Sequence, residues 1–560
     1  MASSSSLHLL VAVVLLLSTP SATALASHPH AHHHKHKHKH KANVTSLSTP
    51  IHQACRAALA PDVCESVISQ LSISLPPDPS GADVALAALS AASRGHQTAR
   101  SNAQSILDAA GSNRNRSTAA HNCLELLSLS DHRISAAIKA LPSGALADSR
   151  TFAGAAELYQ YACRAGLSKV NDTQIVVDAM AFLERLTNLT TSATAMVTAL
   201  QRYGPDTSRW GPPQTERDGY WPEAAAAGSG GEEAGKSFPR PGAPADATVC
   251  KGRECRYRSV QAAVDAAPEN STRPFVIHIK EGVYEETVRV PFEKTNLVFI
   301  GDGMGKTVIT GSLSADMVGV STYNTATVGV TGDGFMARDL TVANTAGPDA
   351  HQAVAYRSDS DRSVLEHVEF LGHQDTLYAS SLRQFYQSCR VSGTVDFIFG
   401  NAAAVFRDCS ILVVPRQLDP EHGETNTVTA HGRSDPAQST GFVFDRCVVN
   451  GSDEYLALYK SNPAVHLAYL GRPWKEYSRT VFIDCSMGEI VRPEGWTLWS
   501  EDFALRTLYY GESGSSGPGG KTTARVPWSS KIPAEHLRAY SLESFIQGDQ
   551  WIPDDLLHNN

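Results

Sequence analysis

The chain has 560 residues, of which 42% are hydrophobic and 19% charged, with 41 Gly, 29 Pro and 10 Cys. This length exceeds what one hydrophobic core supports, and the ordinary composition excludes a disordered, collagen-like or coiled-coil chain. The formal net charge of 48 − 57 = −9 argues against nucleic acid as a partner, and no apolar stretch is long enough for a membrane-embedded helix. We therefore expect a globular protein of two domains.

The first segment, residues 1–26, has the pattern of a secretory signal peptide. An apolar run over residues 7–17, interrupted only by His8, precedes the small-residue site Ala24-Leu25-Ala26. This pattern favours a signal peptide over the start of a buried helix. An even number of cysteines and six Asn-x-Ser/Thr sequons agree with a secreted, extracellular protein; the sequons begin at Asn43, Asn115, Asn171, Asn188, Asn270 and Asn450.

The next segment, residues 27–48, is rich in His and Lys. Eight His alternate with Lys and small residues over residues 28–41. Two interpretations are open: a disordered, solvated tail, or a metal-binding or pH-gated tract that becomes polycationic below about pH 6.5 and binds an acidic polymer. We expect no fixed structure here.

Residues 49–203 predict an all-α domain. Ala, Leu, Ser and Ile recur at helical spacing without strand-like alternation, which indicates a four-helix bundle with no catalytic constellation. Four cysteines permit three connectivities, and we favour Cys55 with Cys64 and Cys123 with Cys163. Residues 204–245, rich in Gly, Pro, Ala and charge, are expected to be a linker.

Residues 246–560 predict an all-β domain, because short Val, Ile and Phe runs are broken by Gly, Asn and Asp. A pattern apolar-x-x-x-Z occurs six times at irregular intervals, at Phe335 to Asp339, Val364 to Val368, Phe385 to Cys389, Val405 to Cys409, Val443 to Cys447 and Val481 to Cys485. Such repeats indicate a solenoid, and a parallel β-helix stacks equivalent residues about 4.8 Å apart. The rival fold, an antiparallel sandwich, would show more Asn-Gly hairpin turns.

The same register has consequences for the cysteines of this domain. It places Cys389 over Cys409, within disulfide reach. The other pairings stay open: Cys447 and Cys485 share the register, and Cys250 and Cys255 are spaced to close a small loop.

Two aspartates occupy the same place in consecutive repeats, because Asp375 follows Val368 by seven residues and Asp396 follows Cys389 by seven. A solenoid holds such side chains next to each other. Two adjacent carboxylates cannot both ionise easily, so the pair should provide one acid and one nucleophile or base. The competing interpretation is a structural ladder of turn residues.

Polar and aromatic residues around the pair suit ester chemistry. Gln352 and Gln374 can donate amide N–H groups to a developing oxyanion, and Arg472 can hold Asp396 ionised through a bidentate contact. Trp474 and Phe399 offer flat faces that suit sugar rings, although burial in the core is the default for a single aromatic residue.

The β region contains five short motifs, in this order: Gly282-Val-Tyr284-Glu-Glu286, Gln352-Ala-Val-Ala-Tyr356, Gly372-His-Gln374-Asp375-Thr376-Leu377-Tyr378, Asp396-Phe-Ile-Phe-Gly400 and Leu470-Gly471-Arg472-Pro473-Trp474. Plant pectinesterases (pectin methylesterases) have the same motifs in the same order. The β region resembles this family over residues 246 to about 552. The helical region is similar to the pectinesterase-inhibitor pro-region that precedes some of these enzymes. That match is looser and rests on Asn122-Cys123-Leu-Glu-Leu126 and Tyr161-Ala-Cys163.

The resemblance implies a right-handed parallel β-helix, no metal or organic cofactor, and hydrolysis of pectin methyl esters in the cell wall. It implies Asp396 as nucleophile and Asp375 as general acid and then base. It further implies that Gln352 and Gln374 line the oxyanion hole, that Arg472 orients Asp396, and that substrate contacts come from Thr322, Gln352, Arg472 and Trp474. The expected partners are methylated homogalacturonan and an inhibitor protein or the chain's own pro-region; we expect a monomer.

Some features depart from the family. Val368 stands where the family often has Cys, and Tyr356 where it has Leu, both tolerable packing variants. The linker lacks the basic processing site expected between pro-region and enzyme, which leaves removal of the pro-region open. Residues 246–560 carry 28 basic and 39 acidic residues, a charge of 28 − 39 = −11, and repulsion from the acidic product favours scattered over blockwise demethylation.

Three other functions fit these residues less well than ester hydrolysis does. A β-helical polysaccharide lyase needs a Ca²⁺ cluster of several carboxylates, whereas the aspartates here are flanked by Gln. A glycosidase with paired carboxylates is compatible with the geometry, but the two Gln suit an ester oxyanion better. A binding protein built on an inactive solenoid is disfavoured because all five catalytic residues are present. The helical domain is interpreted as an intramolecular inhibitor, a folding aid or a retention signal.

Overall fold

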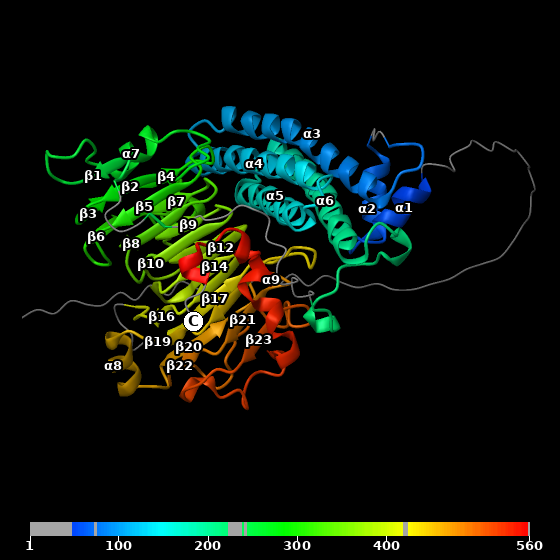
Figure 1. The fold of residues 1–560 in the computed structure, drawn as a ribbon. Coiled ribbons are helices and arrows are strands. Elements are labelled where there is room, and N and C mark those ends of the chain that lie inside the picture. Colours follow the sequence, from blue (N-terminus) through cyan, green and yellow to red (C-terminus); the bar gives the residue numbers. More distant parts are fainter. Residues whose placement is uncertain (1–47, 72–74, 222–237, 240–243, 418–423, 558–560) are drawn as a thin grey trace, which may run out of the picture. The chain divides into compact units, whose positions relative to one another are not determined.

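The computed structural model describes residues 48–71, 75–221, 238–239, 244–417 and 424–557. The predicted signal peptide, residues 27–47 of the His/Lys-rich segment and the sequon at Asn43 lie outside the described residues. A helical region precedes a β region in the chain, and both belong to one compact unit that begins at residue 47 (Figure 1). None of the described helices has the length and apolar character needed to cross a membrane.

The helical region is built from four long helices that pack side by side: α3 (Gly81–Asp108), α4 (Arg114–Ala140), α5 (Leu146–Leu167) and α6 (Gln174–Tyr203). Two short helices, α1 (Ser48–Cys55) and α2 (Pro61–Ser69), precede them. Ser80 and Asp83 form a reciprocal capping box that starts α3, and Asn113 caps α4. The buried faces are rich in Ala and Leu, so the predicted four-helix bundle is confirmed.

Disulfides tie the helices together in pairs. Cys55 bonds to Cys64, which joins α1 to α2, and Cys123 bonds to Cys163, which joins α4 to α5. These are the favoured pairs of the three possible connectivities. In the β region, Cys250 and Cys255 close a small loop.

The β region is a parallel β-helix, as predicted, and every strand pairing in it is parallel (Figure 1). Three ladders run along it. The first contains β1 (Ala247–Val249), β2 (Phe275–Ile279), β5 (Leu297–Gly301), β8 (Met336–Asn344), β10 (Ser363–Leu371), β12 (Arg383–Gln387), β15 (Ala403–Arg407), β18 (Gly441–Asp445), β21 (Arg479–Ile483), β23 (Tyr509–Ser513) and β24 (Ser530–Lys531).

The second ladder shares the long strands β8 and β10 and adds β3 (Gly282–Glu285), β6 (Thr307–Gly311), β13 (Arg390–Gly393), β16 (Ser410–Val413), β19 (Val448–Gly451) and β22 (Ser486–Met487). The third contains β4 (Val288–Val290), β7 (Val328–Val330), β9 (Tyr356–Ser358), β11 (Leu377–Ala379), β14 (Val395–Gly400), β17 (Glu424–His431) and β20 (His466–Gly471). Short helices complete the β region: α7 (Val260–Ala266), α8 (Asp453–Ser461), α9 (Leu542–Ile546) and α10 (Asp554–Leu557).

The interior of the β-helix is filled by stacked apolar side chains. Phe406, Phe444 and Phe482 occupy equivalent positions on three successive coils, with ring centroids 4.7 and 4.5 Å apart. Outside the first ladder, a second apolar layer is covered by C-terminal residues that include Tyr540 and Phe545. Five of the six predicted repeat units lie in the expected register.

The first of the six repeat units begins one residue later in the structure than the pattern predicts. Val364 pairs with Met336 rather than with Phe335, so the equivalent of Val368 is Leu340 and not Asp339. Phe335 faces the interior and Met336 faces the outer layer, so both are apolar and buried. A pattern of apolar residues alone cannot distinguish these two neighbours.

The predicted Cys389–Cys409 disulfide is wrong in this structure: both residues are buried free thiols. The register places them on adjacent coils as expected. Their side chains are held parallel, and each thiol donates to a backbone carbonyl, of Leu365 at 3.3 Å and of Tyr386 at 3.5 Å. Stacking in register therefore brings the sulfurs close without joining them, and Cys447 and Cys485 continue the row as thiols.

Candidate active site

The third ladder places the two predicted aspartates on adjacent coils. Asp375 precedes β11 and Asp396 lies in β14, and Leu377 pairs with Ile398, so the two aspartates are equivalent in register. The Asp375 backbone N–H donates to the carbonyl of Val395 at 3.1 Å. Both aspartates have positive φ, +64° and +52°, a backbone conformation that Asp tolerates better than most residues. The two residues are 7% and 5% exposed, which shields both from solvent.

The two carboxyls have different surroundings. Burial, together with the charge of Asp396, raises the pKa of Asp375 well above its ordinary value, and Arg472 opposes this only in part. No side-chain hydrogen bond to Asp375 is present among the described residues to hold its charge. Asp375 is therefore suited to carry a proton at near-neutral pH.

The carboxylate of Asp396 accepts three hydrogen bonds from side chains. The Arg472 guanidinium donates from Nε to Oδ1 at 2.9 Å and from Nη2 to Oδ2 at 2.7 Å. Thr427, in β17 on the next coil, donates its hydroxyl to Oδ1 at 2.7 Å and accepts the Asp396 backbone N–H at 2.9 Å. These donors fix the direction in which the carboxylate points.

All eight predicted site residues line one cavity of about 810 Å³: Thr322, Gln352, Gln374, Asp375, Asp396, Phe399, Arg472 and Trp474. The two glutamines lie on adjacent coils, because the Ala353 N–H donates to the Gln374 carbonyl at 3.1 Å. Thr322 begins the short helix η4 (Thr322–Thr325). The structure therefore gathers acid, carboxylate, amide donors and cation in one enclosure.

Aromatic rings form one wall of this cavity. Phe399 stacks on Tyr378 with centroids 4.2 Å apart and meets Trp474 edge-on at 6.0 Å. Trp499 lies against the Arg472 guanidinium, 4.5 Å from ring centroid to Cζ, and is 38% exposed. Trp474 and Trp499 are partly exposed, and such rings suit the apolar faces of sugars, whereas Phe399 is only 5% exposed.

Helices α4 and α5 line the other side of the same cavity, with side chains that include Asn122, Leu126, Leu158 and Tyr161. Asn122 exchanges amide hydrogen bonds with Asn324, at 2.8 and 2.9 Å. Tyr161 accepts a hydrogen bond at 2.6 Å from Lys475, the residue directly after the Arg472-Pro-Trp474 motif. The helical region therefore covers the carboxylates.

Metal binding has little support in the described residues. One cluster there brings three metal-ligating side chains within 4.8 Å of one another, namely Cys250, Glu254 and Cys255. Its two sulfurs are joined in a disulfide, which removes both thiolate ligands.

Comparison with known proteins identifies both regions. The family described as pectinesterase matches residues 246–549, and the family described as plant invertase/pectin methylesterase inhibitor matches residues 49–196. The chain belongs to the pectinesterase family. It is 54% identical over 507 residues to probable pectinesterase/pectinesterase inhibitor 64 of Arabidopsis thaliana, covering 90% of this chain and 84% of the relative.

Two further relatives each match 55% of this chain. Pectinesterase 1 of Citrus sinensis is 44% identical over 310 residues, which are 55% of this chain and 52% of the relative. The solved pectin methylesterase from carrot is 43% identical with a TM-score of 0.53, and the match covers 55% of this chain and 95% of the carrot chain. The predicted enzyme class, a pectinesterase, is confirmed.

Several residues of the pectinesterase site give no signal in the sequence. Thr427 lies in a strand whose threonines alternate, Thr425, Thr427 and Thr429, a pattern that predicts strand but gives no sign of contact with Asp396. Trp499 and Lys475 lie outside the five motifs, although Lys475 directly follows Trp474, the last residue of the fifth motif. Only the fold reveals their position at the cavity.

Proposed function

We propose that this protein hydrolyses the methyl esters of galacturonate units in cell-wall pectin through a covalent intermediate on Asp396. Asp396 attacks the ester carbonyl carbon, and Asp375 gives its proton to the departing methanol. Asp375, now ionised, takes a proton from water, which attacks the acyl-enzyme and releases the free uronate and the Asp396 carboxylate. The observation that carries this proposal is the pair itself, one carboxyl without donors and one held by Arg472 and Thr427.

The remaining cavity residues supply binding and charge stabilisation in this proposal. Gln352 and Gln374 donate N–H groups to the oxyanion, since amides cannot compete for the transferred proton. Phe399 and Trp474 pack against sugar rings, and Thr322 and Arg472 contact substrate oxygens. The substrate is therefore methylated homogalacturonan, and the chemistry requires no metal or organic cofactor.

The helical region is proposed to act as an intramolecular inhibitor. Its helices α4 and α5 occupy the space above the carboxylates that a pectin chain must enter. The contact is extensive and specific: Arg133, 1% exposed, makes a bidentate ion pair with Asp333, with N···O distances of 2.6 and 2.7 Å. Arg383 bonds to Asp148 of α5 at 2.7 Å. A folding aid alone needs no such coverage of the site.

The location of the protein follows from its substrate and from the N-terminal pattern. A protein that acts on cell-wall pectin must be exported, and residues 1–26 have the composition of a signal peptide. We therefore propose that it works outside the cell as a monomer, with pectin and its own helical region as partners.

The test is methanol release from highly methylated pectin by residues 238–560, which contain the whole pectinesterase match. Asp396→Asn should lose nearly all activity. The matched control is Asp408→Asn, because Asp408 also has positive φ, +54°, and also bonds to an arginine, Arg446, but does not line the cavity. Chain cleavage without methanol would favour a glycosidase or lyase, and an active Asp396→Asn variant would refute the proposed nucleophile.

A further inference from the structure

Sequence predicts a linker after α6, and the structure shows that residues 204–221 of this segment are anchored at both ends. At its start, Trp210 is 1% exposed in the helical core, and its indole N–H donates to the Gly204 carbonyl at 2.9 Å. A Cβ on Gly81 would lie 2.4 Å from the Trp210 ring, which shows how closely the ring packs on the first turn of α3. This end of the segment belongs to the helical bundle.

The end of the same segment belongs to the β region. Glu216, 7% exposed, accepts from Arg479 of β21 at 2.9 Å and from the Tyr540 hydroxyl at 3.3 Å. Arg217 donates to the carbonyls of Leu505 at 2.6 Å and Trp528 at 3.3 Å. These contacts combine a buried ion pair with charge-assisted hydrogen bonds to backbone.

Trp221 adds an aromatic anchor at the last described residue before the 222–237 stretch. Its ring stacks on His536 with centroids 4.4 Å apart and an interplanar angle of 5°, and it meets Tyr509 edge-on at 5.6 Å. After that stretch, Phe238 is 3% exposed in the same outer apolar layer. The chain is therefore attached to the β region on both sides of residues 222–237.

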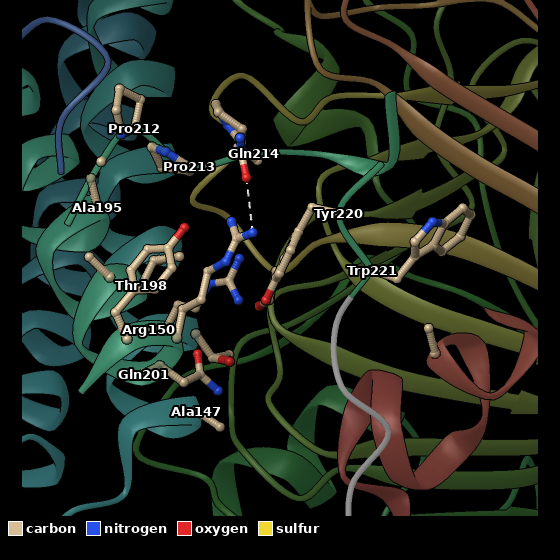
Figure 2. A pocket seen from close by; sticks show the side chains of 18 of the residues that line it. Ala147, Arg150, Ala195, Thr198, Gln201, Pro212, Pro213, Gln214, Tyr220 and Trp221 are labelled. Atoms are coloured by element: carbon tan, nitrogen blue, oxygen red, sulfur yellow. Dashed lines mark hydrogen bonds between the residues drawn. The ribbon is translucent and has the colours of Figure 1, made fainter. Parts of the chain in front are cut away.

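Between its two anchored ends the segment spans a cavity of about 610 Å³ (Figure 2). Pro212 and Pro213 lie on the side of α6 with Ala195 and Thr198, whereas Tyr220 and Trp221 lie on the side of the β region (Figure 2). Gln214 accepts from the Arg202 guanidinium at 3.0 Å, and Arg202 stacks 3.2 Å from the centroid of Tyr220. These contacts brace the segment from the end of α6.

We propose that residues 204–221 form a strap that keeps the helical region bound to the pectinesterase region as a separate chain after the backbone is cut between residues 222 and 237. Every strap anchor lies before the cut and would stay with the helical fragment. The disulfides among the described residues each lie within one fragment, so this binding is non-covalent. The inference rests on the proposed inhibitory role of the helical region. If the strap retains that region over the active site, cutting the backbone alone does not activate the enzyme.

The test uses the full chain with the recognition sequence of a site-specific protease placed within residues 222–237. After complete cutting, we expect the two fragments to co-elute in size-exclusion chromatography at micromolar concentration. The double variant Arg217→Ala with Trp221→Ala should raise the dissociation constant of the fragments at least tenfold. Arg209→Ala is the matched control, because Arg209 lies in the same segment, is exposed, and contacts Tyr203 of the helical region.

Separation of the wild-type fragments on cutting would overturn the inference, as would unchanged affinity in the double variant. The double variant keeps the buried Glu216–Arg479 ion pair, so we expect it to fold. Glu216→Gln then measures the contribution of that ion pair to fragment binding separately. Methanol release from the same samples separates the two proposals: fragments that co-elute yet act as fast as residues 238–560 refute the inhibitory role and leave the strap in place.

Discussion

At the scale of single residues, Thr427 has two contacts with one aspartate: it accepts the Asp396 N–H and donates to the Asp396 carboxylate. A hydrogen bond to a charged group contributes about 1.5–3 kcal/mol, so losing it slows the reaction about tenfold or more. We expect Thr427→Val to lower kcat by that factor, because Asp396 loses a donor that orients its carboxylate. Thr427→Ser should restore kcat.

The matched control for this variant is Thr429→Val, in the same strand. Thr429 is equally buried, but its hydroxyl donates to the Leu470 carbonyl at 2.9 Å and does not touch Asp396. That change should lower stability and leave kcat unchanged. A Thr427→Val enzyme with the kcat of the wild type would show that Thr427 has only a structural role.

Asp375 makes stability depend on pH. Its folded-state pKa is raised by burial and by the charge of Asp396, so its contribution to stability is complete below the unfolded pKa of about 4 and is lost as pH rises through the folded pKa. Asn cannot ionise, so Asp375→Asn should lose less stability than wild type as pH rises from the unfolded pKa through the folded pKa. Denaturation midpoints of residues 238–560 from acidic to neutral pH provide the measurement.

Asp408 supplies a control of opposite sign. Although burial opposes it, hydrogen bonds from Arg446 and Gln387 lower the pKa of Asp408, so its contribution is present above the unfolded pKa and is lost as pH falls. Asp408→Asn should therefore weaken the protein mainly at neutral pH. Equal pH dependence of wild type and Asp375→Asn would contradict the assigned acid.

At the scale of elements, the contact between α5 and the turn after β17 should respond to pH. Burial raises the pKa of Asp435 to about 6, against the opposing Arg433 and Arg150. Burial and then Asp435 raise the pKa of Glu157 of α5 well above its ordinary value. Both carboxyls are more basic when buried in the contact, so attachment of the helical region is strongest at low pH and weakens as pH rises above about 6.

Glu157→Gln removes one of these two ionisations. The dissociation constant of the cut fragments should rise from pH 5 to pH 8 in the wild type and rise less in Glu157→Gln. Arg133, whose pair with Asp333 lies elsewhere in the contact, provides the comparison, because Arg133→Lys should weaken binding similarly at all these pH values. A pH-independent wild-type constant would refute this account of the interface.

The elements also show what sequence can predict. Sequence spacing was enough to place five coils in register, because the alternation of side chains along a strand is set by local backbone geometry. These coils carry Val364, Phe385, Val405, Val443 and Val481. It failed at Phe335, where two apolar neighbours face opposite sides of the sheet. Thr427 and the strap at Glu216 were missed because their partners lie 31 and 263 residues away, and such contacts leave no local pattern.

At the scale of the whole molecule, charge should shape the product. Residues 246–560 carry 28 − 39 = −11, and each hydrolysed ester adds a negative charge to the polymer. Repulsion should release the enzyme after few events, giving short runs of free uronate, and salt should lengthen these runs by screening. Product analysis at about 20 and 200 mM NaCl tests this; long contiguous runs of free acid at low salt would contradict it.

The central claim is that a competent pair of aspartates lies beneath its own helical cover. The most direct measurement is the initial rate of methanol release from highly methylated pectin by the intact chain and by residues 238–560, with Asp396→Asn of each as the blank. The structure predicts that the intact chain is at least tenfold slower, that the shorter chain is active, and that both blanks are silent. An intact chain as fast as residues 238–560 would contradict the cover, and an active blank would contradict the site.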